Sequence, residues 1–294
     1  MSARVGFIGL GAMGRHVALH LRRHGHEVCA FARRPESLLA LTAAGASTAA
    51  SARELAEKSD VVFTMVTATA DVEHVLFGED GVAASARAGL LVVDMSTIAP
   101  AAARTFATRL AASGTDMVDA PVSGGPEGAR DGTLTIMAGG TPDAFSRALP
   151  FFECFGSTIL HMGPSGAGQA TKACHQLLLL ITAEGVAEAL TLAARSGVDP
   201  VLVQQAMMSG IASSRVLDRF GRRMAARAFE DGISARLYRK DLQIVLDQAE
   251  RVGLATPAGE VAMRHLQWLV DEGHGDLDLS ALITAFEKAS HPRR

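Results

Sequence analysis

One lysine in this sequence is placed where it could transfer a proton. Lys172 lies near the start of a predicted long helix, and the residues that follow it, Ala173–Ala183, carry no charge, so we expect the helix to be buried. Because an α-helix repeats every ~3.6 residues, Lys172, His175 and Gln176 share one face. Desolvation lowers the pKa of a buried lysine towards neutrality, which suits it to acid–base chemistry. The alternative is a lysine whose stem is buried while its ammonium reaches water.

A group of hydrogen-bonding atoms follows one of the predicted strands. Ser123, Gly124 and Gly125 come at the end of the strand predicted at Met117–Val122. Ligands of open α/β sheets bind beyond the carboxyl ends of the strands. A hydroxyl and consecutive backbone N–H groups could hold a carboxylate there, although an ordinary turn is the other interpretation. The hydroxyl of Thr97, at the end of another predicted strand, could reach a cofactor.

The first predicted strand runs into a glycine-rich turn that is typical of dinucleotide binding. Gly9, Gly11 and Gly14 are spaced as G-x-G-x-x-G, with Ala12 and Met13 between the last two glycines. The first glycine allows the tight turn, the second lets a pyrophosphate approach the backbone, and the third lets the helix pack closely. The N-terminus of the following helix favours phosphate through its N–H groups and its dipole. The five residues are therefore predicted to bind a cofactor.

The end of the second strand indicates which cofactor. An NAD site normally carries an acidic residue there, which binds the 2′-hydroxyl of the ribose. In this sequence Arg33 and Arg34 follow the strand predicted at Glu27–Phe31, and no carboxylate stands at the tip. A guanidinium binds phosphate through a planar fork of N–H groups. We therefore predict NADP, with NAD possible because Glu36 lies nearby.

The elements that must position these residues alternate between strand and helix in the first half of the chain. Strands are predicted at Val5–Ile8, Glu27–Phe31, Val61–Val66, Leu90–Met95, Met117–Val122, Leu134–Ala138 and Ser157–His161. Helices are predicted between them at Ala12–Arg23, Pro35–Ala44 and Pro100–Ala112. From Gly166 onward the pattern becomes helical, with helices at 166–196, 200–209, 212–227, 235–252, 257–272 and 278–289. Alternation of this kind predicts a parallel sheet that is covered on both faces.

The predicted fold class is therefore α/β, with two domains. Residues 1–163 form an NADP-binding Rossmann domain with a doubly wound sheet. Residues 164–294 form an all-α C-terminal domain for substrate binding and dimerisation, joined to the first by a long interdomain helix. A chain of 294 residues, 48% of them hydrophobic, is long enough for two such cores. The tail His291–Arg294 is expected to be disordered.

Composition excludes several classes of function. A net charge of −3 gives no basic surface for nucleic acid. The three cysteines are Cys29, Cys154 and Cys174, and their wide spacing favours buried free thiols over disulfides or a zinc site. The sequence opens directly into a strand, without the layout of a signal peptide, and we expect a cytoplasmic protein.

No membrane span and no metal site are predicted. The apolar run Leu177–Ala183 is followed by Glu184 and Glu188, which break it well short of the ~20 residues that a membrane-spanning helix needs. His16 and His20 are spaced i, i+4, as in some metal sites, but no third ligand accompanies them.

Together the motifs resemble the β-hydroxyacid dehydrogenase family, which includes 3-hydroxyisobutyrate dehydrogenases and tartronate semialdehyde reductases. The resemblance covers nearly the whole chain. It rests on GFIGLGAMG at Gly6–Gly14, DMST at Asp94–Thr97, DAPVSGG at Asp119–Gly125, the segment Gly163–Lys172, and KDL at 240–242. Several ordered motifs at the right separations are more specific than any one of them.

The resemblance implies a reaction and a role for each matching residue. A nicotinamide cofactor would exchange a hydride with a small hydroxy acid or semialdehyde, as in 2-hydroxy-3-oxopropionate reductase or 3-hydroxyisobutyrate dehydrogenase. Lys172 would be the general acid/base on the substrate oxygen. Residues on the substrate would be Ser123, Gly124 and Gly125. His175 and Gln176 are also expected to contact the substrate, because they lie close to the lysine; the alternative for His175 is a neutral histidine with a structural role. Residues along the cofactor would be Met65, Val66, Thr67, Thr97 and Lys240, with Asp241 beside Lys240. The family also implies a homodimer or a homotetramer.

Other functions stay open. Many family members carry asparagine three or four residues after the lysine, where this chain has His175 and Gln176. This arrangement looks more like threonate dehydrogenases, which act on longer sugar acids, whereas the region 209–257 looks closest to the tartronate semialdehyde reductases. An imine reductase usually lacks a lysine at position 172, and a 6-phosphogluconate dehydrogenase has a much larger helical domain. A non-catalytic NADP-binding scaffold of the same fold is the alternative from another class.

Overall fold

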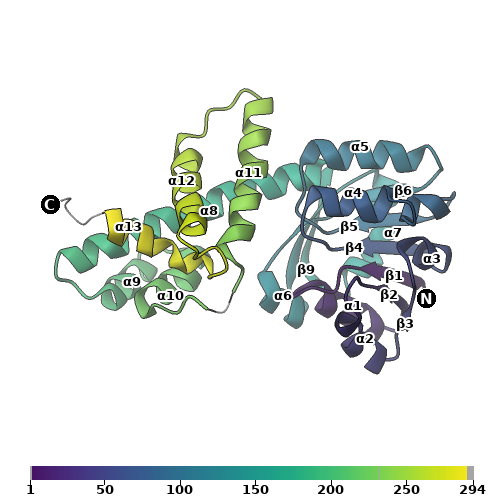
Figure 1. Ribbon diagram of the computed structural model, residues 1–294, viewed down its shortest axis with the longest axis horizontal. Coiled ribbons are helices and arrows are strands. Elements are labelled where there is room, and N and C mark those ends of the chain that lie inside the picture. Colours follow the sequence, from purple (N-terminus) through teal and green to yellow (C-terminus); the bar gives the residue numbers. More distant parts are fainter. Residues whose placement is uncertain (1, 231, 290–294) are drawn as a thin grey trace. The chain divides into compact units, whose positions relative to one another are not determined.

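The computed structural model describes residues 2–230 and 232–289 of the chain (Figure 1). The expectation for His291–Arg294 concerns residues outside those described. The chain divides into two units, Met1–Lys172 and Ala173–Arg294. The dividing point lies inside helix α8 (Ala167–Arg195), whose first residues belong to the first unit and whose remainder belongs to the second. The boundary expected from the sequence, between residues 163 and 164, precedes this helix.

A mixed sheet forms the centre of the first unit. Within the described residues it has nine strands in the order β3-β2-β1-β4-β5-β6-β8-β7, with β9 beside β8. Strands β1 to β6 are parallel to one another, whereas β8 runs antiparallel to β6 and β7 and parallel to β9. The strands are β1 Arg4–Ile8, β2 Glu27–Phe31, β3 Ser47–Thr48, β4 Val61–Thr64, β5 Leu91–Asp94, β6 Asp116–Asp119, β7 Val122–Ser123, β8 Leu134–Gly139 and β9 Gly156–Gly163.

The expectation of a wholly parallel sheet fails after β6. The strand predicted at Met117–Val122 ends at Asp119, because Pro121 has no N–H with which to continue the ladder. The chain turns there, and Val122 and Ser123 form the short β7, which pairs antiparallel with β8. This turn carries the Ser-Gly-Gly segment.

Helices cover both faces of the sheet, as Figure 1 shows. Val61 and Phe63 of β4 pack into one core with α1, α2 and α7, whereas Val62 packs into a second core with α3, α4 and α5. The doubly wound Rossmann arrangement is therefore confirmed, although α3, α4 and α7 were not predicted. The helices are α1 Gly14–Arg23, η1 Pro35–Leu38, α2 Leu39–Ala43, α3 Ala52–Glu57, α4 Thr69–Phe77, η2 Val82–Ser85, α5 Pro100–Ala111, α6 Gly125–Asp131 and α7 Pro142–Phe152.

Helices build the second unit around a core of its own. Leu190, Leu242 and Leu266 are fully buried there. The predicted helical C-terminal domain is therefore confirmed, although the helix expected at 212–227 begins at Arg215, because the hydroxyl of Ser214 accepts the N–H of Leu217. Besides the rest of α8, the elements are α9 Pro200–Met208, a π-helical turn η3 Leu217–Gly221, α10 Arg222–Ala226, α11 Ala235–Arg251, α12 Pro257–Asp271, η4 Leu279–Leu282 and α13 Ile283–Ala289.

Helix α8 is less buried than its sequence indicated. Leu178 and Leu192 are 69% and 67% exposed, and Cys174, which was expected to be a buried thiol, is exposed on the same helix. By length and composition α8 could also cross a membrane, contrary to the estimate from the apolar run, but 44% of its most apolar stretch is buried inside the protein. Glu184 in that stretch is buried and accepts a hydrogen bond from His265 of α12, at 3.0 Å.

Candidate active site

The glycine-rich turn has the geometry that a pyrophosphate requires. Gly9 has a φ of +99°, and a Cβ there would lie 2.3 Å from the carbonyl oxygen of Met65. A Cβ at Gly14, the first residue of α1, would lie 2.0 Å from the carbonyl oxygen of Gly9, so both positions need glycine. A Cβ at Gly11 would meet nothing within 4 Å. The exposed backbone at Gly11 and Ala12 thus has open space above it, which fits a bound phosphate group.

The carboxyl ends of β1, β4 and β5 meet beside this turn. The N–H of Met65 donates to the carbonyl of Ile8 at 2.9 Å. The N–H of Val66 donates to the hydroxyl of Ser96, also at 2.9 Å. Thr67 is exposed and Thr97 is half-buried at the same strand ends. The structure therefore brings together the stretches that were predicted to lie along the cofactor.

Both arginines after β2 are exposed. The side chain of Arg33 is 79% exposed, and its nearest carboxylate oxygen, on Asp71, lies 3.8 Å away. An ion pair this long and this exposed contributes little, so it would not hold the guanidinium against a phosphate. Arg34 and Glu36 are exposed as well. The residues at this position fit a 2′-phosphate better than a bare ribose hydroxyl.

Lys172 is buried, and its ammonium does not simply reach water. The residue is 8% exposed, and Nζ donates to the carbonyl oxygen of Val122 at 2.8 Å. Val122 begins β7 and directly precedes Ser123, so the lysine lies beside the Ser-Gly-Gly turn. Gly124 and Gly125 have φ angles of +133° and +65°, which other residues rarely adopt. The predicted acid/base and the predicted carboxylate site are therefore next to each other.

The start of α8 is fixed by two residues to which the sequence analysis gave no role. Asp119, at the end of β6, is 1% exposed and accepts the N–H groups of Gly166 and Gln169 at 2.6 and 2.9 Å. Burial raises the pKa of Asp119 to about 7, although these two hydrogen bonds act in the opposite direction. The side chain of Gln169 accepts from the N–H of Ile98 and donates to the carbonyl of Ser96. The only signal in the sequence was that Gln169 lies one turn before the lysine.

A chain of side-chain hydrogen bonds lies in the second unit. Nε2 of Gln176 donates to Oδ2 of Asp241 at 2.6 Å, and Nζ of Lys240 lies 2.8 Å from Oδ1 of Asp241. Oε1 of Gln176 lies 2.9 Å from Nδ1 of His175. A carboxylate only accepts hydrogen bonds, so the amide nitrogen of Gln176 faces Asp241, and its oxygen accepts from Nδ1 of His175. In the neutral ring Nε2 of His175 is then an acceptor.

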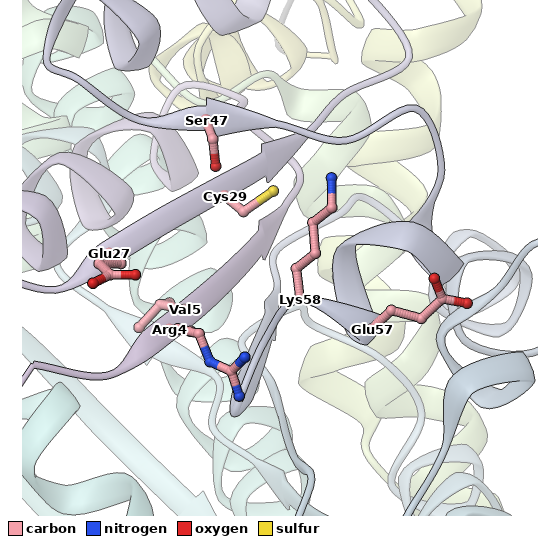
Figure 2. Close-up of a pocket in the computed structure, with 7 residues that line it drawn as sticks. All are labelled: Arg4, Val5, Glu27, Cys29, Ser47, Glu57 and Lys58. Carbon is pink, nitrogen blue, oxygen red and sulfur yellow. The ribbon is translucent and has the colours of Figure 1, made fainter.

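A cavity of about 380 Å³ lies at the opposite edge of the sheet (Figure 2). Arg4 and Glu27, which line it, are the first residues of β1 and β2. Ligands of this type of sheet bind at the carboxyl ends of the strands, so this cavity is not the dinucleotide site. Its cations are paired with neighbouring acids, Arg4 with Asp60 and Lys58 with Glu54.

A Rossmann unit with a buried lysine near the carboxyl ends of its strands is typical of nicotinamide-dependent oxidoreductases, and comparison with known proteins identifies the family. The NAD-binding domain of 6-phosphogluconate dehydrogenase matches residues 4–163. The NAD-binding domain of NADP-dependent 3-hydroxyisobutyrate dehydrogenase matches residues 166–286.

Relatives and solved structures agree with these matches. The chain is 42% identical to 2-hydroxy-3-oxopropionate reductase of Escherichia coli (strain K12) over 97% of each chain. It is 38% identical to 3-hydroxyisobutyrate dehydrogenase of Pseudomonas aeruginosa over 95% of this chain and 96% of the relative. A solved structure of Mycobacterium tuberculosis 3-hydroxyisobutyrate dehydrogenase with L-serine is 31% identical, with a TM-score of 0.89 over 97% of this chain and 99% of that one. The chain belongs to the β-hydroxyacid dehydrogenase family and is an NAD(P)-dependent hydroxy acid dehydrogenase or reductase.

Proposed function

We propose that this enzyme exchanges a hydride between NADP and a small hydroxy acid or semialdehyde, with Lys172 as the general acid/base. The observation that carries this proposal is the hydrogen bond of 2.8 Å from Nζ of Lys172 to the carbonyl of Val122. It holds a buried ammonium beside Ser123, Gly124 and Gly125, the proposed binding site for the substrate carboxylate. A carboxylate held there would place a nearby carbonyl or hydroxyl oxygen within reach of the amine.

The chain's own residues divide the work of the reaction. In reduction, the ammonium of Lys172 polarises the carbonyl and donates the proton; in oxidation, the neutral amine takes the proton of the hydroxyl. The nicotinamide supplies the hydride chemistry. Ser123 and the two following N–H groups orient the acid, and His175 and Gln176 contact the rest of the substrate. Lys240, beside Asp241, would bind the cofactor.

The cofactor would be NADP in preference to NAD. Arg33 and Arg34 would bind the 2′-phosphate, and Gly9, Gly11 and Gly14 with the intervening Ala12 and Met13 would bind the pyrophosphate. Met65, Val66, Thr67 and Thr97 would line the path of the dinucleotide. The exposure of both arginines and the absence of an acid at the tip of β2 support this preference.

The substrate would be the semialdehyde of a 2-hydroxy-3-oxopropionate reductase or the acid of a 3-hydroxyisobutyrate dehydrogenase, in keeping with the similarity to both relatives. One observation favours the alternative, a longer sugar acid such as threonate. With Nδ1 of His175 donating to Gln176, Nε2 would accept from an additional substrate hydroxyl. We assign cofactor binding to residues 1–163 and substrate binding to 164–294, and we place the enzyme in the cytoplasm, without nucleic-acid or membrane partners.

We also propose that two copies of the chain associate through α8. Leu178, Gly185 and Leu192 repeat every seven residues along its exposed face, and a Cβ at Gly185 would meet nothing within 4 Å. Leu178 and Leu192 lie symmetrically about Gly185, so an antiparallel two-fold contact would place each Leu178 on Leu192 of the partner subunit. Leu178→Glu should shift the protein to monomer in sedimentation velocity. The control is Leu39→Glu, at an equally exposed leucine of the first unit.

The catalytic proposal is tested by a spectrophotometric panel at about 340 nm, where the reduced nicotinamide absorbs. Tartronate and succinate semialdehydes are offered for reduction, and glycerate, 3-hydroxyisobutyrate, threonate and serine for oxidation, each with both cofactors. Wild type, Lys172→Met and the surface control Lys288→Met are compared. Lys172→Met should lower kcat by roughly 10²–10⁴-fold without weakening NADPH binding, whereas the control should match wild type. Tight NADPH binding without turnover of any acid would instead favour a non-catalytic scaffold.

A further inference from the structure

The first turn of α8 is held by one buried carboxylate. Oδ1 of Asp119 accepts the N–H of Gly166 at 2.6 Å, and Oδ2 accepts the N–H of Gln169 at 2.9 Å. Both oxygens are therefore used by the same helix end. Asp119 is 1% exposed, so water does not compete for these bonds.

The helix and the strands behind it are in backbone contact at this point. A Cβ at Gly168 would lie 2.3 Å from the carbonyl oxygen of Met137 and 2.5 Å from that of Asp119. A Cβ at Gly139 would lie 2.7 Å from Oδ1 of Asp119. Because no side chain separates the helix from β6 and β8, a shift of the helix start changes the distances to Asp119 directly.

The segment that holds the helix start also receives the lysine. Asp119 ends β6, and Val122, which accepts from Nζ of Lys172, begins β7. Gln169, bound through its N–H by Asp119, lies one helical turn before Lys172, and its side chain is bonded to Ser96 and Ile98. The helix turn that carries Lys172 is thus fixed at both ends.

We propose that Asp119 is a positioning residue, whose carboxylate fixes the first turn of α8 and so sets the place of Nζ of Lys172 relative to the Ser123–Gly125 turn. The inference rests on the proposed acid/base role of Lys172. It goes beyond that role because it names the group that determines the geometry.

A carboxylate is needed because the task requires two acceptors. An asparagine offers one acceptor and one N–H group, and the N–H group would face a backbone N–H. A protonated aspartic acid has the same defect, and the raised pKa of Asp119, about 7, brings that form into the working pH range. Asp94 on β5 is the neighbouring charge and raises the pKa further, while β8 contributes Gly139 and α8 contributes backbone N–H groups.

The first test measures hydrogen exchange and does not depend on activity. Asp119→Asn is compared with wild type and with Asp116→Asn, an exposed aspartate at the start of the same strand. The amides of 166–169 should exchange about tenfold faster in Asp119→Asn, as expected for one lost hydrogen bond, and peptides from α11 should be unchanged. Unchanged exchange at 166–169 would overturn the proposal. If Asp119→Asn does not fold, Asp119→Ser, which replaces the two carboxylate oxygens with one hydroxyl, is measured in the same way, and the amides of 166–169 should again exchange faster.

The second test measures turnover on the acid identified by the substrate panel. Asp119→Asn should lower kcat by roughly 10–100-fold, as a displaced catalytic group does, while the affinity for NADPH stays that of wild type. The pH profile of wild type should show an acid limb that Asp119→Asn lacks. Faster exchange with an unchanged kcat would overturn the positioning role. If wild type turns over no acid, the proposed function fails, but the positioning role of Asp119 can still be tested by the rate at which Lys172 is acetylated by a trace of reagent. This rate should be higher in Asp119→Asn than in wild type, and an unchanged rate would contradict the proposal.

Discussion

The two polar networks along α8 are built from different atoms. In the first unit most hydrogen bonds join a side chain to a backbone group. The N–H groups of Gly166 and Gln169 donate to Asp119, and Lys172 donates to the carbonyl oxygen of Val122. In the second unit His175, Gln176, Asp241 and Lys240 bond to one another through side chains.

The difference separates two tasks. Backbone groups keep their place whatever the neighbouring side chains are, so the first network suits the steps that every reaction of this family shares, cofactor binding and proton transfer. Side-chain groups change with a single substitution, so the second network suits the choice of substrate. Substitutions in the first network should therefore alter stability and kcat, and those in the second should alter selectivity.

The largest loss of stability is expected at Gly168, where the backbone of α8 contacts the strands behind it. Gly168→Ala should destabilise the protein by about 3 kcal/mol or more, because its Cβ would overlap two backbone carbonyl oxygens that cannot move aside. Gly210→Ala, at an exposed glycine after α9, is the control. It should change the stability little, because its Cβ would come no closer than 3.9 Å to the carbonyl oxygen of Met207. Chemical denaturation measures both; equal effects would contradict the backbone contact.

The ionisation of Asp119 provides a second test of how the first network affects stability and kcat. Its pKa is about 7 in the folded protein and near 3.8 when unfolded, so between these values the folded state retains a proton that the unfolded state has released. The contribution of Asp119 to stability is therefore greatest below pH 4 and is lost as the pH rises to 7, by an amount on the order of 4 kcal/mol. Stability of wild type relative to Asp119→Asn should fall over this range while kcat rises. A constant difference would show that Asp119 does not titrate there.

Sequence predicted the parts of the site that depend on glycine. Gly9, Gly14 and Gly124 are required by steric overlap or a positive φ, and such constraints leave a recognisable spacing in the sequence. Seven of the nine described first-unit strands were predicted for a similar reason, since buried strands read as short apolar runs, whereas the two-residue β3 and β7 were not predicted. The short α3 and α4 were not, because they lack a long apolar period.

The remaining features depend on partners that are distant in sequence. Asp119 binds residues 47 and 50 positions away, and Gln169 binds one 73 positions away, so no local pattern records either contact. The end of β6 at Asp119 does have a local signal, because Pro121 has no N–H with which to continue the strand. The exposure of Leu178 could not be inferred either, because an apolar helix face has the same sequence pattern whether it packs against its own chain or against a second copy.

A moderate effect on the preference for NADPH over NADH is expected at Arg33, an exposed side chain proposed to bind the 2′-phosphate. Arg33→Ala should weaken NADPH binding about tenfold, the loss of one charge-assisted hydrogen bond, and leave NADH binding nearly unchanged. Fluorescence titration of both cofactors measures this. Arg53→Ala, at an exposed arginine paired with Glu57, serves as the control. Equal losses for NADPH and NADH would remove the assignment of a 2′-phosphate site.

The smallest effect, on selectivity alone, is expected in the second network. Asp241→Asn removes the carboxylate that orients the amide of Gln176, so Nδ1 of His175 no longer has a fixed acceptor. Both tautomers of the ring then become populated, which nitrogen-15 shifts of His175 would report. The preference for an acid with an additional hydroxyl, such as threonate, over 3-hydroxyisobutyrate should fall about threefold, because a neutral hydrogen bond contributes about 0.5–1.5 kcal/mol. Asp247→Asn, at an exposed aspartate of α11 bonded to Gln243, should leave both quantities unchanged. A change in kcat for every acid alike would instead mean that the second network acts on catalysis, and the division of tasks along α8 would be lost.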